Sequence, residues 1–180
     1  MSTVERISED YLKMQTELHQ IPTYGTSSLI YAPIVAQLMQ QYKLSSVSDY
    51  GAGKKNLLVG LERAGIRPSV YLPYDPVFPE YGEPKPAQLV CCIDVLEHIE
   101  PELLHNILGD LKRITTTLGF FTVHTGPAKK VLPDGRNAHL IQESNSWWLE
   151  KLIPSFEILH LQANPQGNPG FWVIVAPRNG

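Results

Sequence analysis

Three aspartates stand where apolar, strand-like segments of the chain end. Asp49, Asp75 and Asp94 each lie at or just after the end of such a segment. Because the carboxyl ends of parallel strands meet at one edge of a sheet, we expect the three carboxylates to converge there. One aspartate in such a place is often only the cap of a turn or helix, but three in succession favour a site. The sequence therefore predicts a pocket for a polar ligand.

A glycine turn, Gly51-Ala52-Gly53, follows the first of these aspartates. Glycine removes side chains where the chain turns sharply, so the backbone can come close to a ligand. Taken alone, such a turn is equally often a plain connection between a strand and a helix. Its place beside the converging aspartates favours ligand binding.

Two histidines near predicted strand ends could act on a substrate. His98 and His139 could each serve as a general base near neutral pH, although a lone histidine is more often structural. Glu97 precedes the first of them and could contact the substrate. These three residues could also bind a metal ion, but none of their spacings is typical of a metal site, and we predict no metal.

A polar loop, residues 126–137, carries basic side chains toward the same edge. Arg136 could pair with an anionic group of the substrate, with help from Lys129 and Lys130. The alternative is a basic loop that only faces water.

Helix-like and strand-like patterns alternate along the chain, which indicates how these residues are positioned. The predicted helices span about 8–19, 29–42, 55–64, 101–117 and 146–152. The predicted strands span 45–49, 69–72, 88–93, 120–125, 156–162 and 171–176. This alternation predicts an α/β fold with a doubly wound, mostly parallel sheet, helices on both faces and a C-terminal antiparallel hairpin.

The composition fits one folded domain and excludes some partners. The chain has 180 residues, 43% of them hydrophobic, and a formal charge of −3, which gives no general attraction to duplex nucleic acid. It lacks an apolar run of the roughly 18 residues that span a bilayer, and its polar start does not resemble a signal peptide, so we expect a cytoplasmic location. The neighbouring Cys91 and Cys92 lie in an apolar run and are expected to be buried thiols.

Three motifs resemble those of the class I S-adenosylmethionine-dependent methyltransferases, and the resemblance covers roughly residues 24–176. Ser48-Asp49-Tyr50-Gly51-Ala52-Gly53-Lys54 looks like that family's acidic glycine loop. Tyr71-Leu72-Pro73-Tyr74-Asp75 looks like its second strand, which ends in a ribose-binding acid. Asp94-Val95-Leu96-Glu97-His98-Ile99 looks like its fourth-strand segment. Residues 24–28 and 134–140 are similar to segments of small bacterial and phage methyltransferases.

The resemblance implies a Rossmann-like fold with S-adenosyl-L-methionine as cofactor. It places residues 1–180 in a single domain, with N-terminal helices in 1–43 as a cap and a cofactor-binding core in 44–180. The cofactor-binding residues that it implies are Tyr24, Thr26, Asp49, Gly51, Ala52, Gly53, Asp75, Pro76, Asp94 and Val95. From the residue types and their places at strand ends, we expect Glu97 and Arg136 on the substrate side and His98 or His139 in catalysis.

Two features depart from the family pattern. Lys55 replaces the third glycine that is common in the first loop, so the following helix is expected to start differently or to lie farther from the sheet. Between Asp75 and Leu89 the chain is rich in proline, so the family's usual third strand is expected to be missing or very short.

The predicted function is methyl transfer from S-adenosylmethionine to a small-molecule, sugar or nucleotide-type acceptor, because 180 residues leave little room for a recognition domain. A nucleic-acid or protein methyltransferase is disfavoured by the acidic charge and by Asp94-Val95-Leu96-Glu97, which stands in the place of an Asn-Pro-Pro-Tyr-type motif. A third alternative is a non-catalytic binding or assembly module with the same fold, suggested by Lys55. The sequence leaves open whether the chain forms a homo-oligomer.

Overall fold

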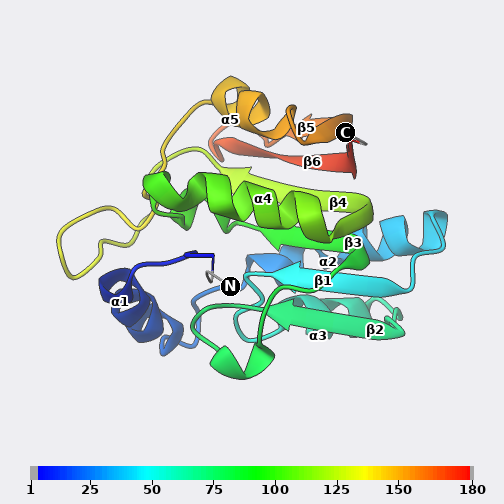
Figure 1. Cartoon of the computed structure of the whole chain (residues 1–180), viewed down its shortest axis with the longest axis horizontal. Coiled ribbons are helices and arrows are strands. Elements are labelled where there is room, and N and C mark those ends of the chain that lie inside the picture. The colour runs from blue at the N-terminus through cyan, green and yellow to red at the C-terminus, as the bar shows by residue number, and fades with distance from the viewer. Residues whose placement is uncertain (1–3, 179–180) are drawn as a thin grey trace.

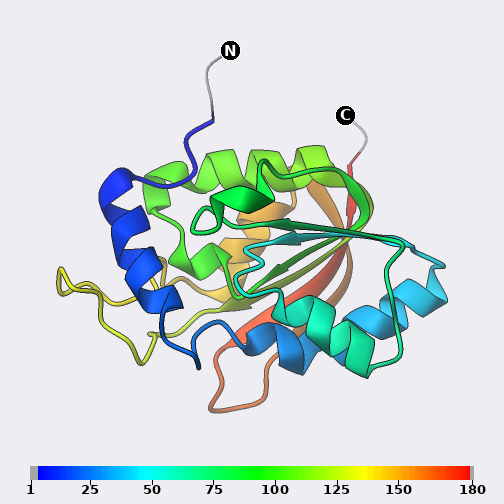
Figure 2. The ribbon, with the colours of Figure 1, turned by 90° about the horizontal axis from the view of Figure 1, so that it is seen from below.

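Six strands form one sheet with helices on both faces (Figures 1 and 2). The computed structural model describes residues 4–178. The strands are β1 (Ser46–Tyr50), β2 (Val70–Tyr74), β3 (Ala87–Ile93), β4 (Thr115–His124), β5 (Phe156–Ala163) and β6 (Gly170–Pro177). The helices are α1 (Glu9–His19), α2 (Ser27–Gln41), α3 (Asn56–Arg63), α4 (Leu104–Ile114) and α5 (Asn145–Leu152), with short 3₁₀ helices at Pro79–Tyr81, Leu96–His98 and Pro101–Leu103.

The strand order is β2-β1-β3-β4-β6-β5, and it confirms the predicted α/β fold. The first four strands of this order run parallel, whereas β6 pairs antiparallel with both β4 and β5. From β1 the chain crosses first to β2 on one side and then to β3 on the other, so the strand order reverses between β1 and β3. In open α/β sheets, ligands bind beyond the carboxyl ends of the strands at such a reversal.

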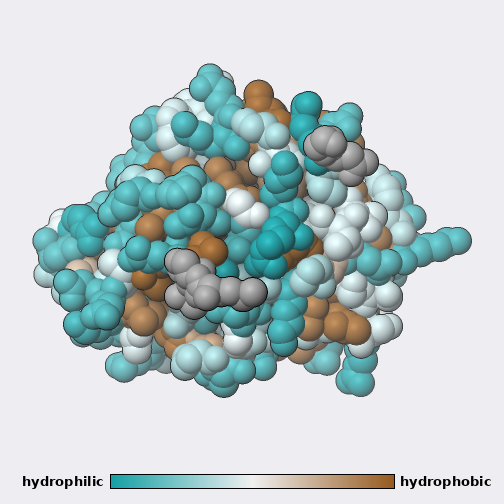
Figure 3. Space-filling view, viewed as in Figure 1, coloured by the Kyte–Doolittle hydropathy of each residue, from teal (hydrophilic) through white to brown (hydrophobic). Residues whose placement is uncertain are grey.

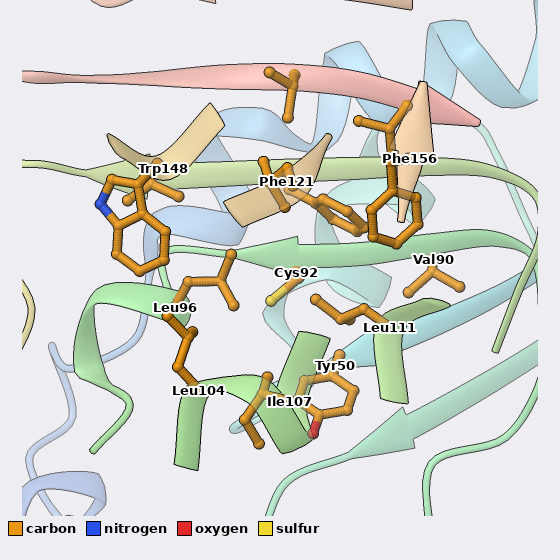
Figure 4. Close-up of a cluster of buried hydrophobic side chains, with 14 of the residues drawn as sticks. Tyr50, Val90, Cys92, Leu96, Leu104, Ile107, Leu111, Phe121, Trp148 and Phe156 are labelled. Carbon is orange, nitrogen blue, oxygen red and sulfur yellow. The ribbon is translucent and has the colours of Figure 1, made fainter. Parts of the chain in front are cut away.

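Each face of the sheet has its own hydrophobic cluster. On one face α4 and α5 pack through Leu111 and Trp148 against Phe121 and Phe156, all fully buried (Figure 4). On the other face α2 and α3 bury a second cluster. Neighbouring strand residues point to opposite faces, so Cys92 lies in the first cluster and Cys91 in the second. Both thiols are free and buried, as predicted.

The end of α4 differs from the sequence prediction, whereas the segment between β2 and β3 agrees with it. The helix predicted over 101–117 ends at Ile114, and Thr115–Thr117 open β4 instead. The reason is local, because three successive β-branched threonines favour a strand and the Thr115 hydroxyl donates to the Leu111 carbonyl 2.6 Å away. The predicted lack of a third strand is confirmed, since the described segment between β2 and β3 contains only the 3₁₀ helix Pro79–Tyr81.

Helix α1 lies beyond the carboxyl ends of the parallel strands rather than on either face of the sheet (Figures 1 and 2). It begins where the Ser8 hydroxyl accepts the Tyr11 amide, and Glu100 accepts both the amide and the hydroxyl of Ser8, at 2.8 and 2.6 Å. The face of the molecule seen in Figure 3 is mostly hydrophilic, with hydrophobic residues scattered over it. Among residues 4–178, no helix is both long and apolar enough to cross a membrane.

Candidate functional site

A cavity of about 380 Å³ lies at the carboxyl ends of β1, β2 and β3, and α1 lines it through Tyr11, Gln15 and His19. This volume is within the usual range for sites that bind small ligands, about 300–1,000 Å³. The predicted site residues that line it are Tyr24, Thr26, Gly51, Gly53, Asp75, Pro76, Asp94, Val95, Glu97, His98 and His139. Asp49, Ala52 and Arg136 are not among its lining residues. The cavity therefore brings together most of the residues that the motifs indicated.

The glycine loop gives space rather than hydrogen-bond donors. Gly51 and Ala52 donate their amides to the Tyr74 carbonyl, at 2.8 and 2.9 Å, so both N–H groups are bound within the protein. Gly51 has φ +79°, and a Cβ added there would lie 2.3 Å from Cγ2 of Val95. Glycine is required here because Val95, two residues after β3, packs directly on the loop at the reversal of the strand order.

Asp75 is buried at the end of β2 and closes the other side of the loop. Its two carboxylate oxygens accept the amides of Gly53 and Val77, each at 2.9 Å. The His19 imidazole of α1 lies 3.8 Å from one of these oxygens. Burial raises the pKa of Asp75, and the two amide hydrogen bonds and His19 oppose this shift. Each oxygen keeps a lone pair, so the carboxylate can still accept hydroxyl groups of a ligand.

Asp49 precedes the glycine loop, and its surroundings differ from those of Asp75. It is 2% exposed and accepts a hydrogen bond from the hydroxyl of Tyr71 on β2. Burial raises the pKa of Asp49 to about 7, while the Tyr71 hydrogen bond opposes the shift and the nearby Asp75 adds to it. Its contacts tie β1 to β2 below the cavity floor.

Asp94 follows β3 with a left-handed backbone, φ +52°, that residues other than glycine rarely adopt. Its carboxylate accepts the Thr122 hydroxyl at 2.5 Å, and its amide donates to the same hydroxyl oxygen at 2.9 Å. Two bonds to one threonine of β4 hold this conformation. The turn directs the chain into the 3₁₀ helix that carries Glu97 and His98.

The wall opposite the sheet is formed by α1 and the turn after it. The Tyr11 hydroxyl donates to the His98 carbonyl at 2.6 Å, and Gln15 donates to the Tyr11 hydroxyl oxygen, also at 2.6 Å. Tyr24 in turn donates to Gln15 at 3.3 Å. The sequence interpretation treated α1 as a cap and assigned no role to Tyr11, Gln15 or His19. The polar residues among its apolar positions were the signal that could have identified them.

A cluster of polar side chains occupies the end of the cavity nearest β3 and β4. One ligand-capable atom each from Glu97, His98 and His139 lies within 4.8 Å of the other two. The imidazoles of His98 and His139 meet edge to face, with ring centroids 4.8 Å apart. His124 lies beside them, 5.0 Å from the His139 ring. The loop after β4 produces this cluster, because it returns His139 to the residues that follow β3.

Hydrogen bonds hold both imidazoles in one orientation. His98 Nδ1 lies 2.8 Å from the Ala138 carbonyl, and His139 Nδ1 lies 2.7 Å from the Gly126 carbonyl. A carbonyl only accepts, so Nδ1 carries the proton in both rings and Nε2 keeps its lone pair. Burial lowers the pKa of His98 to about 3, with His139 adding to the shift, and burial also lowers the pKa of His139. Both rings are neutral at pH 7.

Arg136 is the substrate-side residue that the fold leaves outside the cavity. Its guanidinium pairs with Asp134 at 2.7 Å and lies over the Tyr11 ring. Lys129 and Lys130 of the same loop do line the cavity. The basic side chains of this loop that reach the site are thus the two lysines, and Arg6 lines the cavity as well.

Comparisons with known proteins show the fold. The structure is similar to that of 1,6-didemethyltoxoflavin-N1-methyltransferase from Burkholderia thailandensis, solved with 1,6-didemethyltoxoflavin and S-adenosylhomocysteine, with TM-score 0.65, 13% identity and 99% of this chain and 94% of that one covered. It is also similar to magnesium protoporphyrin IX methyltransferase from Synechocystis, solved with S-adenosylhomocysteine, with TM-score 0.54, 11% identity and coverages of 97% and 90%.

A third similar structure is the mitomycin 7-O-methyltransferase, with TM-score 0.59 and 16% identity, where the match covers 86% of this chain and 55% of that one. No protein-family model and no curated protein matches the sequence. At these identities the likeness is one of fold, and the chain has the Rossmann-like fold of class I methyltransferases.

Proposed function

We propose that this chain is an S-adenosylmethionine-dependent methyltransferase for a small-molecule, sugar or nucleotide-type acceptor. The observation that carries the proposal is one cavity at the reversal of the strand order with two different ends. One end has the open glycine loop and the buried carboxylate of Asp75. The other end has two neutral imidazoles with free Nε2 atoms.

The cofactor would be held at the glycine-loop end. Asp75 can accept hydrogen bonds from a pair of ribose hydroxyls, and Tyr24, Pro76 and Val77 offer largely apolar walls to the rest of an adenosyl group. At Gly53 a Cβ would meet only His19 of α1, 3.7 Å away, so this part of the loop leaves room for a ligand close to the backbone. When bound, S-adenosylmethionine supplies an electrophilic methyl group on a positively charged sulfur.

The acceptor would be held at the histidine end, where the chain's own residues can manage a proton. An acceptor nucleophile that carries a proton must lose it during methyl transfer, and Nε2 of His98 or His139 can accept it. The carbonyls of Ala138 and Gly126 keep those lone pairs available, because they bind the opposite nitrogens. General-base help of this kind accelerates a reaction by about 100-fold or more.

The size and charge of the site favour a small acceptor. The cavity is bounded by α1, which is tied down by the Ser8 to Glu100 and Tyr11 to His98 hydrogen bonds. The chain carries a net charge of −3, so a polyanionic substrate would not be attracted to it as a whole. Lys129 and Lys130 at the cavity rim could bind one anionic group of a small acceptor.

Calorimetry with S-adenosylmethionine, S-adenosylhomocysteine and NAD tests the cofactor half of the proposal. We expect both adenosyl compounds to bind and to raise the melting temperature, because a ligand that binds only the folded state stabilises it. NAD, the cofactor of dehydrogenases with a similar glycine turn, is expected to do neither, because Gly51-Ala52-Gly53 lacks the later glycine of that fingerprint. No heat and no thermal shift with either adenosyl compound at millimolar concentration would contradict the proposal.

A screen of small acceptors with methyl-labelled S-adenosylmethionine tests the catalytic half. We expect label transfer to a hydroxylated or amine-bearing acceptor, and a loss of about 100-fold in rate when the histidine that acts as base is replaced by alanine. Cofactor binding without transfer to any acceptor would instead support the non-catalytic module.

A further inference from the structure

Glu97 carries a buried carboxyl group that has no part in the mechanism proposed above. It is fully buried, and its Oε1 accepts the His124 amide at 3.0 Å. Its other oxygen, Oε2, has no hydrogen-bond partner among residues 4–178. No lysine or arginine of the described chain forms an ion pair with it. Burial raises the pKa of Glu97 well above its ordinary value, and a cation bound at Oε2 would offset the cost of the charged form.

The two neighbouring imidazoles are arranged as metal ligands usually are. In protein metal sites a histidine typically donates its second ring N–H to a carbonyl or carboxylate, which fixes the ring and turns the other nitrogen to the ion. His98 and His139 both do this, through the Ala138 and Gly126 carbonyls at 2.8 and 2.7 Å. The His139 amide also donates to the Asn137 side chain at 2.9 Å, which positions the loop.

The geometry points to a divalent transition-metal site formed by Glu97, His98 and His139, and we propose that it binds Zn²⁺ or a similar ion such as Co²⁺. Two imidazoles and one carboxylate are a donor set that such ions favour. Zn²⁺ holds nitrogen and oxygen at about 2.0–2.2 Å, so tetrahedral ligand atoms lie roughly 3.5 Å apart. The three candidate atoms here lie within 4.8 Å of one another, so the side chains must move closer together to bind the ion.

Three protein ligands leave at least one coordination position free, and the three residues all line the cavity. The role of the ion rests on the methyl-transfer function proposed above, although its binding does not. An ion with an open position toward the cavity would bind an oxygen of the acceptor, which makes a hydroxylated small molecule the acceptor class. In the ion-loaded protein the imidazoles are ligands, and the ion's charge would favour release of the hydroxyl proton to solvent water. The bound oxygen would then form its bond to the methyl group as the bond from sulfur to that group breaks, which leaves a neutral thioether.

Titration of the chelator-treated 180-residue chain with Co²⁺, followed by visible absorption, tests the ion site. We expect the wild type to develop the absorption of Co²⁺ in a low-symmetry nitrogen and oxygen site. Glu97→Gln is expected to weaken binding at least tenfold. His105→Ala is the matched control, because His105 is an exposed histidine of α4 outside the cluster, and this variant is expected to bind like the wild type.

The variant His139→Cys gives a readout that a purely structural role would not produce. A thiolate in the first coordination shell adds a sulfur-to-cobalt charge-transfer band in the near ultraviolet, and Cys91 and Cys92 are too deeply buried to contribute one. We expect this band only in His139→Cys. Absence of Co²⁺ absorption in the folded wild type, or Co²⁺ binding by His139→Cys without the band, would overturn the proposed site. If Glu97→Gln fails to fold, the comparison of the wild type with His139→Cys still shows whether His139 is a ligand of the ion.

Calorimetry with S-adenosylhomocysteine separates the ion site from the proposed function. We expect the chelator-treated protein to bind this ligand as tightly as the Co²⁺-loaded protein, while label transfer to a hydroxylated acceptor is lost without the ion. Co²⁺ binding without any binding of the adenosyl compound would leave the ion site intact and contradict the methyltransferase. Adenosyl binding and full activity in the chelator would support an imidazole base and exclude the ion.

Discussion

The two ends of the cavity differ in how their polar groups are used. At the glycine-loop end the amides of Gly51, Ala52 and Gly53 and the oxygens of Asp75 already form hydrogen bonds within the protein. At the histidine end Glu97 Oε2 has no partner in the described chain, and the Nε2 atoms of two imidazoles are free. The polar groups of the glycine-loop end are therefore already paired within the protein, whereas those of the histidine end have atoms left to bind a ligand.

This difference has a physical consequence for mutations. Where polar groups are already paired, a substitution acts through shape and through the bonds it breaks inside the protein. Where they are unpaired, a substitution can leave the fold intact and remove only ligand contacts.

Replacing Gly51 by alanine should affect the molecule most. The added Cβ would meet Val95 at 2.3 Å, and the residue would have to keep φ +79°. We expect the free energy of unfolding to fall by about 2–4 kcal/mol, from overpacking and backbone strain together, and binding of S-adenosylhomocysteine to be lost. Chemical denaturation and calorimetry measure these two effects.

Gly53→Ala is the matched control for that variant. A Cβ at Gly53 has only His19 nearby, at 3.7 Å, so the cost is limited to its positive φ, about 1–2 kcal/mol. The double variant Gly51→Ala, Val95→Ala should regain part of the lost stability. Equal destabilisation by the two glycine variants would show that contact with Val95 is not what requires glycine.

Asp75→Ala should weaken binding of S-adenosylhomocysteine by roughly 1.5–3 kcal/mol, the value of hydrogen bonds to a charged group. The comparison variant is His98→Gln at the other end, which should leave this affinity unchanged. Calorimetry on both proteins, with circular dichroism to check folding, gives the answer. Tight binding by Asp75→Ala, or a matching loss in His98→Gln, would place the adenosyl group elsewhere.

Acid should destabilise the histidine end. Burial and the nearby His139 lower the pKa of His98 to about 3, below its ordinary value of 6.5. As pH falls from 6.5 toward 3, the unfolded chain binds a proton that the folded chain does not, so stability is present above pH 6.5 and is lost below it. One such group contributes at most about 1.4 kcal/mol per pH unit.

Denaturation of the wild type and His98→Gln from pH 7 to pH 4, in a chelator, measures this contribution. The free energy of unfolding should fall less steeply with acid in His98→Gln. Parallel curves for the two proteins would mean that His98 takes up its proton as readily in the folded chain as in the unfolded one.

The smallest effect concerns Lys55, which adopts φ +60° directly before α3. Glycine tolerates this conformation without a steric cost, so Lys55→Gly should raise the free energy of unfolding by up to about 1 kcal/mol. Loss of the contact between the Lys55 ammonium and the Tyr81 ring, 4.6 Å away, partly offsets the gain. Thermal melting checks this prediction, and a clear drop would show that the ring contact outweighs the strain.

The sequence by itself determined the order of strands and helices, the single sheet with its C-terminal hairpin, and the edge at which the candidate residues gather. These follow from hydrophobic periodicity and from turn residues, which act over short stretches of chain. Asp75, Asp94 and the glycine turn were found in this way. The end of α4 was missed although its signal is local, because the three successive β-branched threonines at 115–117 favour a strand.

Only the tertiary structure decided what each polar group does. Asp49, Asp75 and Asp94 follow the same local pattern, yet one ties two strands together, one braces the glycine loop and one holds a strained turn against Thr122. His139 stands 41 residues after His98 in the sequence. Their contact depends on the path of a long loop and on which carbonyl meets which nitrogen, and a spacing rule along the chain carries no information about either.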